Sequence, residues 1–280
     1  MSPALPTSED NQARPRADET GAVLRFEDVT LSFSGVPVLE GISFAVAPGE
    51  TKVLLGETGA GKSLILKLAL GLLRPDGGRI FLLGNEVTAL SEDELFPLRR
   101  HVGMVFQESA LFDSLTVREN VAYPLEQERH ADAAAIEERV RACLQFVELE
   151  ATLDKRPDEL SGGMRRRVAI ARALAAAPAV MLYDSPTGGL DPVTATTIVE
   201  LIIRLRDARK VSSLLVTHRL QDAALMATHA WDQARGQLRP ADPDHSHTRF
   251  LLLRARRLAF EGDARALLAI DDPYIRRYLA

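Results

Sequence analysis

The segment from Gly56 to Ser63 constrains the fold of this chain more than any other feature. It reads GETGAGKS, follows the apolar run TKVLLG and opens the apolar stretch LILKLALGLL. A G-x-x-x-x-G-K-S turn between a buried strand and a helix is typical of a loop that wraps phosphate groups. Its glycines let backbone N–H groups point at phosphate oxygens, and the helix adds its positive dipole end. The sequence therefore predicts a phosphate loop at residues 56–63.

Two side chains of this loop and one aspartate are expected to hold a nucleotide and its metal. Lys62 should reach the β- and γ-phosphates, and the hydroxyl of Ser63 should ligate Mg²⁺. Asp184 ends the apolar run VMLYD. Ligands of a parallel sheet sit at the carboxyl ends of its strands, so Asp184 is placed to hold Mg²⁺ through water, opposite Ser63. Taken alone, Asp184 would also suit a helix N-cap ahead of Pro186.

Apolar runs alternate with helical patterns along most of the chain. This order predicts an α/β fold with a parallel sheet that is covered on both faces. The expected strands are 23–33, 38–46, 50–56, 78–84, 179–184 and 211–218. The expected helices are 64–73, 91–100, 130–149, 164–177 and 192–209.

The chain divides into a tail, a main domain and a second tail. Residues 1–21 are rich in Pro, Ser and charge and are expected to be disordered. Residues 22–262 form the main domain, with a helical insertion at about 90–165 between its α/β halves. Within its C-terminal part, 233–249 looks like an inserted polar loop and 249–262 could be a hairpin. The last segment, 263–280, is helical in pattern.

Composition excludes several classes of function. The 280 residues carry a formal net charge of −5, which disfavours a general nucleic-acid binder. The run Arg165–Arg167 is therefore expected to be a solvated helix face. The lone Cys143 cannot form an intrachain disulfide, and His245 and His247 are expected to lie in a solvated loop. The N-terminus lacks the apolar core of a secretory signal, and no apolar stretch is long enough to span a bilayer. We expect a cytosolic chain whose membrane role comes through a partner.

Five further short motifs, taken in order, resemble those of ATP-binding cassette (ABC) ATPases. The segment 160–164 reads LSGGM, like the signature motif of that family. Its Ser161 lies 23 residues before Asp184. The others are Phe33 for an adenine-stacking aromatic, Gln107 for the Q-loop, Asp191 in GLD for the D-loop and His218 in VTH for the switch histidine.

The resemblance implies the P-loop NTPase fold of ABC ATPases, with a RecA-like parallel core, an antiparallel β subdomain and a helical subdomain. It implies catalytic roles for Lys62, Gln107, Ser185 and His218, and metal ligation by Ser63, Gln107 and Asp184. The residues that would bind ATP are Phe33, Gly56, Glu57, Thr58, Gly59, Ala60, Gly61, Lys62, Ser63, Leu64, Gln107, Ser161, Gly162, Gly163, Asp191 and His218.

A second anion site in the same chain points to a dimer. Residues 161–163 precede a helix, so their N–H groups can also face a phosphate. The implied assembly is a head-to-tail homodimer, or a dimer with a second ATPase subunit, that sandwiches two ATP molecules. Each ATP would lie between the phosphate loop of one subunit and the signature of the other.

The chain departs from the family beside Asp184. The family places a glutamate there, which polarises the attacking water, whereas this chain has Ser185. A serine hydroxyl can only hydrogen-bond that water at neutral pH, and loss of a general base costs about 10²–10⁴ in rate. Hydrolysis would then be slow and depend on His218, or the chain would be a regulatory subunit whose partner carries the glutamate.

The segment 102–125, which reads VGMVFQESALFDSLTVRENVAYPL, resembles the ATPases of MCE-associated (Mla-type) phospholipid transporters, as does the ending DDPYIRRYL. The resemblance implies an Mla-type membrane permease as partner, an MCE-domain lipid-binding protein as an indirect one, and a place on the cytoplasmic face of the inner membrane. Leu111, Phe112 and Leu115 suit a groove for the permease; the alternative for half of them is a place in the core of the insertion. A non-transport ABC ATPase is the remaining alternative.

Overall fold

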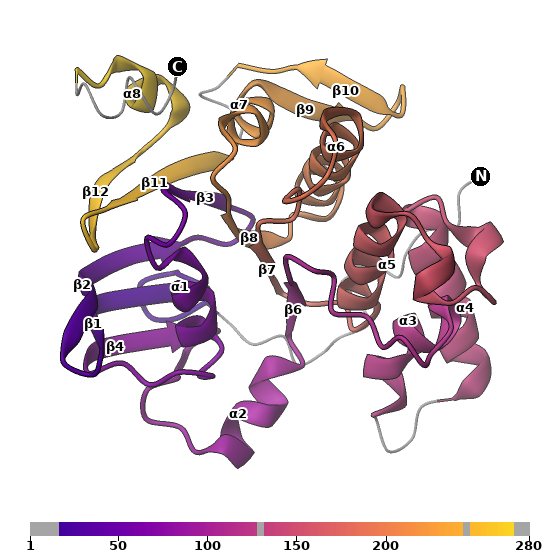
Figure 1. Ribbon diagram of the computed structural model, residues 1–280, viewed down its shortest axis with the longest axis horizontal. Coiled ribbons are helices and arrows are strands. Elements are labelled where there is room, and N and C mark those ends of the chain that lie inside the picture. Colours follow the sequence, from indigo (N-terminus) through magenta and orange to yellow (C-terminus); the bar gives the residue numbers. More distant parts are fainter. Residues whose placement is uncertain (1–16, 128–131, 243–246, 272–280) are drawn as a thin grey trace.

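A six-stranded sheet crosses the centre of the molecule in the computed structural model, which describes residues 17–127, 132–242 and 247–271 (Figure 1). Its strand order is β12-β11-β3-β8-β7-β6, and all neighbours are parallel except the β11–β12 hairpin. The expected parallel sheet and the hairpin in 249–262 are therefore confirmed. The strands are β3 (Thr51–Gly56), β6 (Val102–Val105), β7 (Val180–Asp184), β8 (Ser212–Val216), β11 (Thr248–Arg254) and β12 (Arg257–Gly262).

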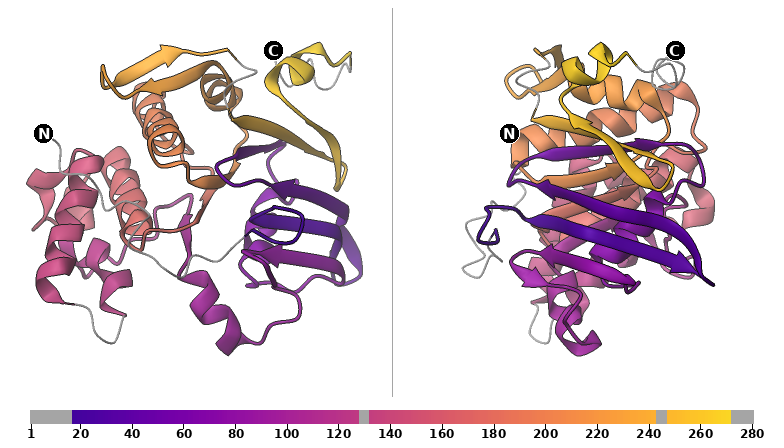
Figure 2. Two further views of the ribbon diagram at one scale, coloured as in Figure 1. Left: turned by 180° about the vertical axis from the view of Figure 1, so that it is seen from behind. Right: turned by 90° about the vertical axis from the view of Figure 1, so that its left-hand side faces the viewer.

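An antiparallel sheet lies beside this core sheet, with helix α1 (Lys62–Ala69) close to both (Figures 1 and 2). Its strand order is β2-β1-β4-β5. The β1–β2 pair is antiparallel, as the short turn at residues 34–35 requires, and the β1–β4 pair is antiparallel as well. Its strands are β1 (Leu24–Phe33), β2 (Val36–Val46), β4 (Gly77–Leu82) and β5 (Asn85–Glu86).

Alternation along the central strands divides the apolar interior into two cores. On β3, Leu54 belongs to the core shared with α1 and the antiparallel sheet, whereas Val53 and Leu55 belong to the core under the other helices. Successive side chains of a strand point to opposite faces, so a continuously apolar strand needs cover on both sides. The phosphate loop follows such a strand and begins on a rigid support.

Most of the remaining helices cover the opposite face and the far end, whereas α2 packs into the core shared with α1. The group α3, α4 and α5 lies at the end of the molecule opposite the antiparallel sheet, and α6 and α7 lie next to the core sheet (Figures 1 and 2). These elements are α2 (Glu92–Arg99), α3 (Val117–Glu126), α4 (Ala133–Phe146), α5 (Gly162–Ala175), α6 (Pro192–Arg209), α7 (Leu220–Thr228) and α8 (Ala264–Ala269). Short 3₁₀ turns occur at η2 (Glu150–Thr152) and η3 (Pro157–Glu159).

The structure differs from the sequence expectations in two places. The segment 90–165 is not helical throughout, because β6 lies inside it and pairs with β7 in the core sheet. The polar stretch 233–249 is not simply a loop, because β10 (Gln237–Pro240) pairs with β9 (His229–Asp232). All three strands have only four residues, and β9 and β10 are also mixed in polarity, so their sequences show no clear strand pattern.

At both ends the structure describes only part of what was expected. Ala17 to Gly21 are described, and Asp18 accepts a hydrogen bond from Arg25 Nε at 2.6 Å, so this part of the expected tail is attached to β1. In the C-terminal segment, α8 is described to Ala269. Residues 1–16, His245 and the ending 272–280 lie outside the described residues. Among the helices that the structure does describe, none combines the length and apolar character needed to cross a membrane.

Asn120, buried on α3, organises the loop that joins β6 to α3. Its Oδ1 accepts from the backbone N–H of Phe112 at 2.9 Å. Its Nδ2 donates to the carbonyl oxygens of Phe112, Leu115 and Thr116 at 3.1, 3.2 and 3.0 Å. The side-chain amide of Asn120 thus satisfies backbone groups that have no partner in a helix or sheet, and it fixes the loop that follows Gln107.

Asn120→Leu should lower the free energy of unfolding by about 2–3 kcal/mol, because several buried loop groups lose their partner at once. Urea unfolding of the full chain measures it. Glu119→Ala is the matched control on the same helix: it removes only the capping box with Thr116 and should cost about 1 kcal/mol. Equal losses in the two variants would contradict the role given to Asn120.

Candidate functional site

The phosphate loop leaves β3 and enters α1 with a backbone that requires glycine. Gly61, the N-cap of α1, has φ = 99°, which is the left-handed region. At Gly56, a Cβ would lie 2.7 Å from the carbonyl oxygen of Leu253 on β11. These two positions explain why the loop carries small residues there, and they direct its backbone around an open centre.

Lys62 brings its cation into the middle of this loop. Its Nζ donates to the carbonyl oxygens of Gly56 and Glu57 at 2.8 and 2.7 Å, and the side chain is buried. Burial lowers the pKa of Lys62, while the charges of Asp184 and Glu57 oppose that shift. An ammonium has three donors, so the two loop carbonyls leave capacity for a phosphate oxygen.

Ser63 and Asp184 meet next to this lysine. The hydroxyl of Ser63 donates to Asp184 Oδ1 at 2.9 Å, joining the first turn of α1 to the end of β7. Among the described residues, no group of three or more His, Cys, Asp or Glu could hold a metal. One carboxylate and one hydroxyl suit a Mg²⁺ ion that takes its other ligands from phosphates and water. The residues present therefore fit the expected metal.

A pocket of about 320 Å³ opens over the loop and collects side chains from four parts of the chain. Gln107 after β6, Ser185 after β7 and His218 after β8 line it together with the start of α1. From the sequence we expect these three side chains and Lys62 to act together, and the structure brings all four to one pocket. The full lining is Thr58, Gly59, Gly61, Lys62, Ser63, Leu64, Gln107, Ser185, Val216 and His218.

Ser185 occupies the pocket wall with strained backbone geometry. Its φ is 45°, its N–H donates to the carbonyl oxygen of Val216 at 2.8 Å, and its carbonyl oxygen accepts from Gly188 N–H at 2.9 Å. The backbone of Ser185 lies in the left-handed region and is hydrogen-bonded at both its N–H and its carbonyl oxygen, so the direction of the side chain is fixed. That side chain can position water in the pocket, but it cannot take a proton from it at neutral pH.

Phe33 lies at the edge of the site and does not line the pocket. It ends β1, pairs with Val36 on β2 and is 47% exposed. Further along β2, the carbonyl oxygen of Val38 lies 3.5 Å from the position that a Cβ would take on Gly61. The exposed ring is thus carried on a hairpin that adjoins the phosphate loop.

The signature residues do not join this pocket. Ser161 caps α5 by accepting from Met164 N–H at 3.3 Å, and Asp191 caps α6 by accepting from Val193 and Thr194 N–H at 3.1 and 3.0 Å. Hydrogen bonds from Thr194 and then Val193 hold the pKa of Asp191 below its ordinary value.

The two capped helix starts adjoin each other. A Cβ on Gly162 would lie 3.4 Å from Leu190, which is an ordinary contact, whereas one on Gly163 would lie 2.3 Å from the side chain of Thr194, so the close approach calls for glycine at position 163. None of Ser161, Gly162, Gly163 and Asp191 lines the phosphate pocket of its own chain. The chain therefore presents its expected nucleotide-binding residues in two separate places.

The sequence analysis missed two arginines near the pocket. Arg166 was expected on a solvated helix face, and that expectation is wrong because the side chain is 4% exposed. The helical spacing from the buried Gly163 to the buried Ile170 would have placed residue 166 on the inner face. Arg219, which follows His218, is also half-buried and gave no sequence signal.

The linker 186–190, defined as the residues between Ser185 and Asp191, is anchored from α7. Thr187 is buried and its hydroxyl donates to Asp222 Oδ2. Thr217 Oγ1 donates to the same oxygen at 3.4 Å. Burial raises the pKa of Asp222, and the bonds from Thr187 oppose that shift.

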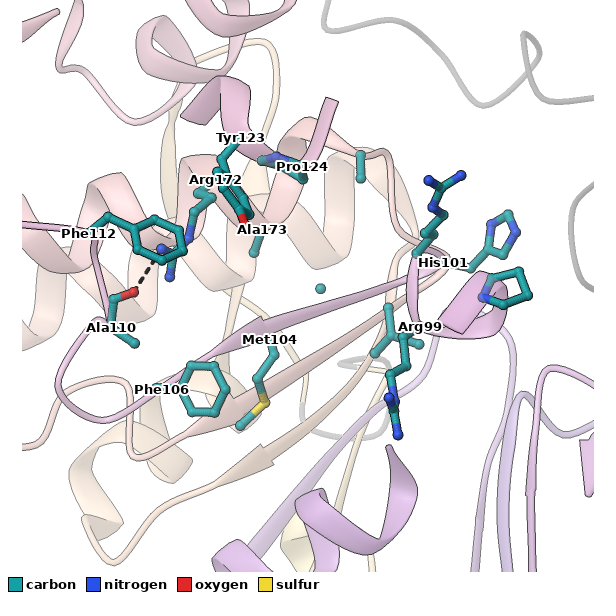
Figure 3. Close-up of a pocket in the computed structure, with 15 residues that line it drawn as sticks. Arg99, His101, Met104, Phe106, Ala110, Phe112, Tyr123, Pro124, Arg172 and Ala173 are labelled. Atoms are coloured by element: carbon teal, nitrogen blue, oxygen red, sulfur yellow. Dashed lines mark hydrogen bonds between the residues drawn. The ribbon is translucent and has the colours of Figure 1, made fainter. Parts of the chain in front are cut away.

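A second pocket, of about 580 Å³, lies away from the nucleotide site (Figure 3). It runs between β6, the start of the loop after it, α3 and α5. The rings of Phe112 and Tyr123 stand 4.7 Å apart and are 42% and 41% exposed. Of the three expected groove residues, Phe112 lines the pocket, whereas Leu111 packs against the core and Leu115 is half-buried.

Arg172 of α5 braces this second pocket. Its Nη1 donates to the carbonyl oxygen of Ala110 at 2.7 Å, and its guanidinium lies 5.8 Å from the ring centre of Phe112 (Figure 3). Arg172 and Asn120 thus both donate hydrogen bonds to the backbone of the loop after Gln107. These bonds support the loop that forms the wall of the aromatic groove.

Comparisons with known proteins agree with this geometry. Residues 39–188 match the family described as ABC transporter. The intermembrane phospholipid transport system ATP-binding protein MlaF of Escherichia coli strain K12 is 33% identical over 90% of this chain and 86% of its own length. The methionine import ATP-binding protein MetN of Rhizobium johnstonii is 41% identical over 75% of this chain, but 58% of its own.

Solved structures show the same fold. A dimeric ATP-binding cassette in a post-hydrolysis state bound to ADP and Pi has a TM-score of 0.72 and 29% identity, covering 86% of this chain and 98% of that one. The chain is an ATPase that binds ATP, and cassettes of this kind act as dimers with a membrane permease. Since the matched segment covers more than half of the sequence, the chain belongs to the ABC transporter family.

Proposed function

We propose that this chain is the ATP-hydrolysing subunit of a phospholipid transporter of the Mla type, docked to a permease on the cytoplasmic face of the inner membrane. The observation that carries the proposal is the groove of Figure 3, because the segment with the Mla-type sequence pattern, 102–125, forms much of its wall. The relative MlaF, similar over 90% of this chain, supports the same cargo. An MCE-domain lipid-binding protein would then be an indirect partner.

Within this proposal the phosphate loop and Lys62 bind the phosphates, and Phe33 stacks on the adenine at the adjoining hairpin. Ser63, Asp184 and Gln107 hold Mg²⁺, which on binding would neutralise phosphate charge. Ser161, Gly162, Gly163 and Asp191 contact the ATP held by a second copy. The separation of the two sets within one chain supports that division, since one nucleotide cannot reach both.

Water in the pocket is oriented by Gln107, Ser185 and His218, which line it together. The transition state of phosphoryl transfer is loose, so positioning and charge stabilisation carry most of the catalysis. Lys62 supplies a fixed charge at one side of the pocket, and the three polar side chains supply hydrogen bonds at another. This arrangement supports slow hydrolysis without a carboxylate base.

Ser185 also favours a second arrangement, in which this chain is a regulatory nucleotide-binding subunit. In a dimer with a second ATPase, the glutamate of that partner and the signature residues 161–163 of this chain would complete one efficient site. The site built on the phosphate loop of this chain would then turn over little.

The cargo can be tested against the methionine import that the name of MetN indicates. The tagged chain, purified from native membranes with its permease, should show ATPase activity that rises with added phosphatidylglycerol or phosphatidylethanolamine and not with L-methionine. Co-purified phospholipid should be found by mass spectrometry. Stimulation by L-methionine alone would overturn the proposed cargo and leave the ATPase assignment unaffected.

Ser185→Glu should raise kcat for ATP, within the range of about 10²–10⁴ that a general base contributes, because the side chain lines the pocket. Steady-state phosphate release measures it. Ser185→Gln is the matched control, since it has the length of glutamate without its basicity, and it should give no increase. An unchanged or lower kcat in Ser185→Glu would show that the water step does not limit turnover.

Tyr123→Asp should release the chain from its membrane complex, because a charge in the aromatic groove opposes burial of an apolar partner. Co-purification with the permease measures the loss, expected to be at least tenfold, on the order of 1.4 kcal/mol or more. ATP binding by the isolated chain should persist. Leu72→Asp is the control, because Leu72 is 51% exposed and lies outside the groove; equal loss in both variants would contradict docking here.

A further inference from the structure

Arg166 ties two functional segments together through one buried guanidinium. Its Nη1 donates to the carbonyl oxygen of Phe106 at 2.7 Å, and its Nη2 donates to that of Gly188 at 3.3 Å. Phe106 directly precedes Gln107, and Gly188 belongs to the linker 186–190. The planar fork of an arginine suits such a bridge, because its donors keep a fixed spacing.

The burial of Arg166 is costly for a merely structural contact. Among the residues that the structure describes, no carboxylate lies within ion-pair distance of it, and its buried Nε has no hydrogen-bond acceptor. Asp184 and Glu108 act on its charge only from further away. A neutral side chain would fill this place without desolvating a cation. The arginine is therefore better explained by what its fork holds than by stability.

Arg219 contacts the same linker at its last residue, Leu190. Its Nη1 donates to the carbonyl oxygen of Leu190 at 3.4 Å, and its Nε lies 3.4 Å from Asp222 Oδ1. Arg219 directly follows His218, as Phe106 directly precedes Gln107. The linker is thus held beside both side chains that would orient water.

We propose that Arg166 and Arg219 are positioning residues for ATP hydrolysis, forming an arginine clamp that fixes the linker 186–190 against Gln107 and His218. The inference rests on the roles proposed above for those two side chains. Because Ser185 supplies no carboxylate, water placement depends on hydrogen bonds alone, and a misplacement of about 1 Å can cost 10²-fold in rate. The linker ends at Asp191, so the clamp also connects the water site to the surface that faces a second copy.

A double-mutant cycle on the full chain tests the clamp. Arg166→Met should lower kcat by about 10–100-fold and change KM for ATP less than about threefold, because orientation fails while phosphate binding persists. Combined with Gln107→Ala, it should cost less than about twofold beyond the larger single effect, since both remove the same function. The pair Arg219→Met and His218→Ala should show the same non-additivity in kcat. Arg166→Lys should not rescue, because one ammonium cannot bridge both carbonyls.

Arg204→Met is the control for lost packing. Arg204 donates to the carbonyl oxygen of Phe146 at 3.3 Å and lines neither the nucleotide pocket nor the linker. Arg204→Met removes an arginine–carbonyl contact elsewhere in the fold and should leave kcat intact, whatever its effect on the melting temperature. If Arg166→Met fails to fold, Arg166→Gln, which is neutral and retains one donor group, replaces it in the cycle.

Three results would overturn the clamp in distinguishable ways. Suppose that Gln107→Ala and His218→Ala lower kcat, but that each arginine variant lowers kcat by the same factor with and without the paired change. The arginines then do not act through Gln107 and His218, and only the clamp is wrong. If Gln107→Ala and His218→Ala leave kcat intact, the proposed roles of both side chains fail together with the clamp. A rise in KM with unchanged kcat in both arginine variants would also overturn it.

Discussion

The carboxyl edge of the parallel sheet is the constraint on which the rest of the site depends. Parallel pairing places Leu54 of β3 beside Val216 of β8, and Val216 beside Asp184 of β7. The backbone continues this register beyond the strands, because Ser185 N–H donates to Val216 and Thr217 N–H donates to Leu54. The phosphate loop, the candidate metal ligand and the switch histidine are therefore brought together by main-chain pairing before any of their side chains interact.

The same edge explains how a buried lysine is tolerated. Lys62 is desolvated by α1 and the loop around it, which by itself disfavours a charged ammonium. Two carbonyl oxygens of the loop accept hydrogen bonds from the ammonium, and the negative charge of Asp184 attracts it. These partners hold the cation in place, so a bound phosphate would meet a charge whose position is already fixed.

Local sequence patterns predicted the parts of the molecule in which local chemistry and fold agree. The phosphate loop, the strand that ends at Asp184 and the helix from Pro192 to Arg209 all have clear boundary residues beside a segment of uniform character. Strand β6 could not be found in this way, since the four apolar residues VGMV are too short a run to indicate a strand without the pairing with β7. The pairing of β9 with β10 depends on tertiary packing in the same manner.

Long-range side-chain contacts limited the prediction of the site. The order of the motifs predicted that Gln107, Ser185 and His218 would share a pocket, but the chain gives no local sign that Arg166 reaches carbonyl oxygens of two distant loops. A run of three arginines favours a solvated face in sequence, whereas the helix turns one of them inward. Helical spacing could have placed Arg166 on the inner face, but only the packing of α5 shows which carbonyl oxygens it reaches.

The serine at position 185 gives these contacts their importance. A glutamate would carry much of the water activation through its own basicity and would tolerate some looseness around it. With Ser185, the pocket has no carboxylate base, and its remaining charges and hydrogen bonds act through distance and angle. Under the proposed function, the contacts of the linker, the bridge from Arg166 and the strained backbone of Ser185 then serve one requirement. A site without a carboxylate base must hold its remaining groups in place.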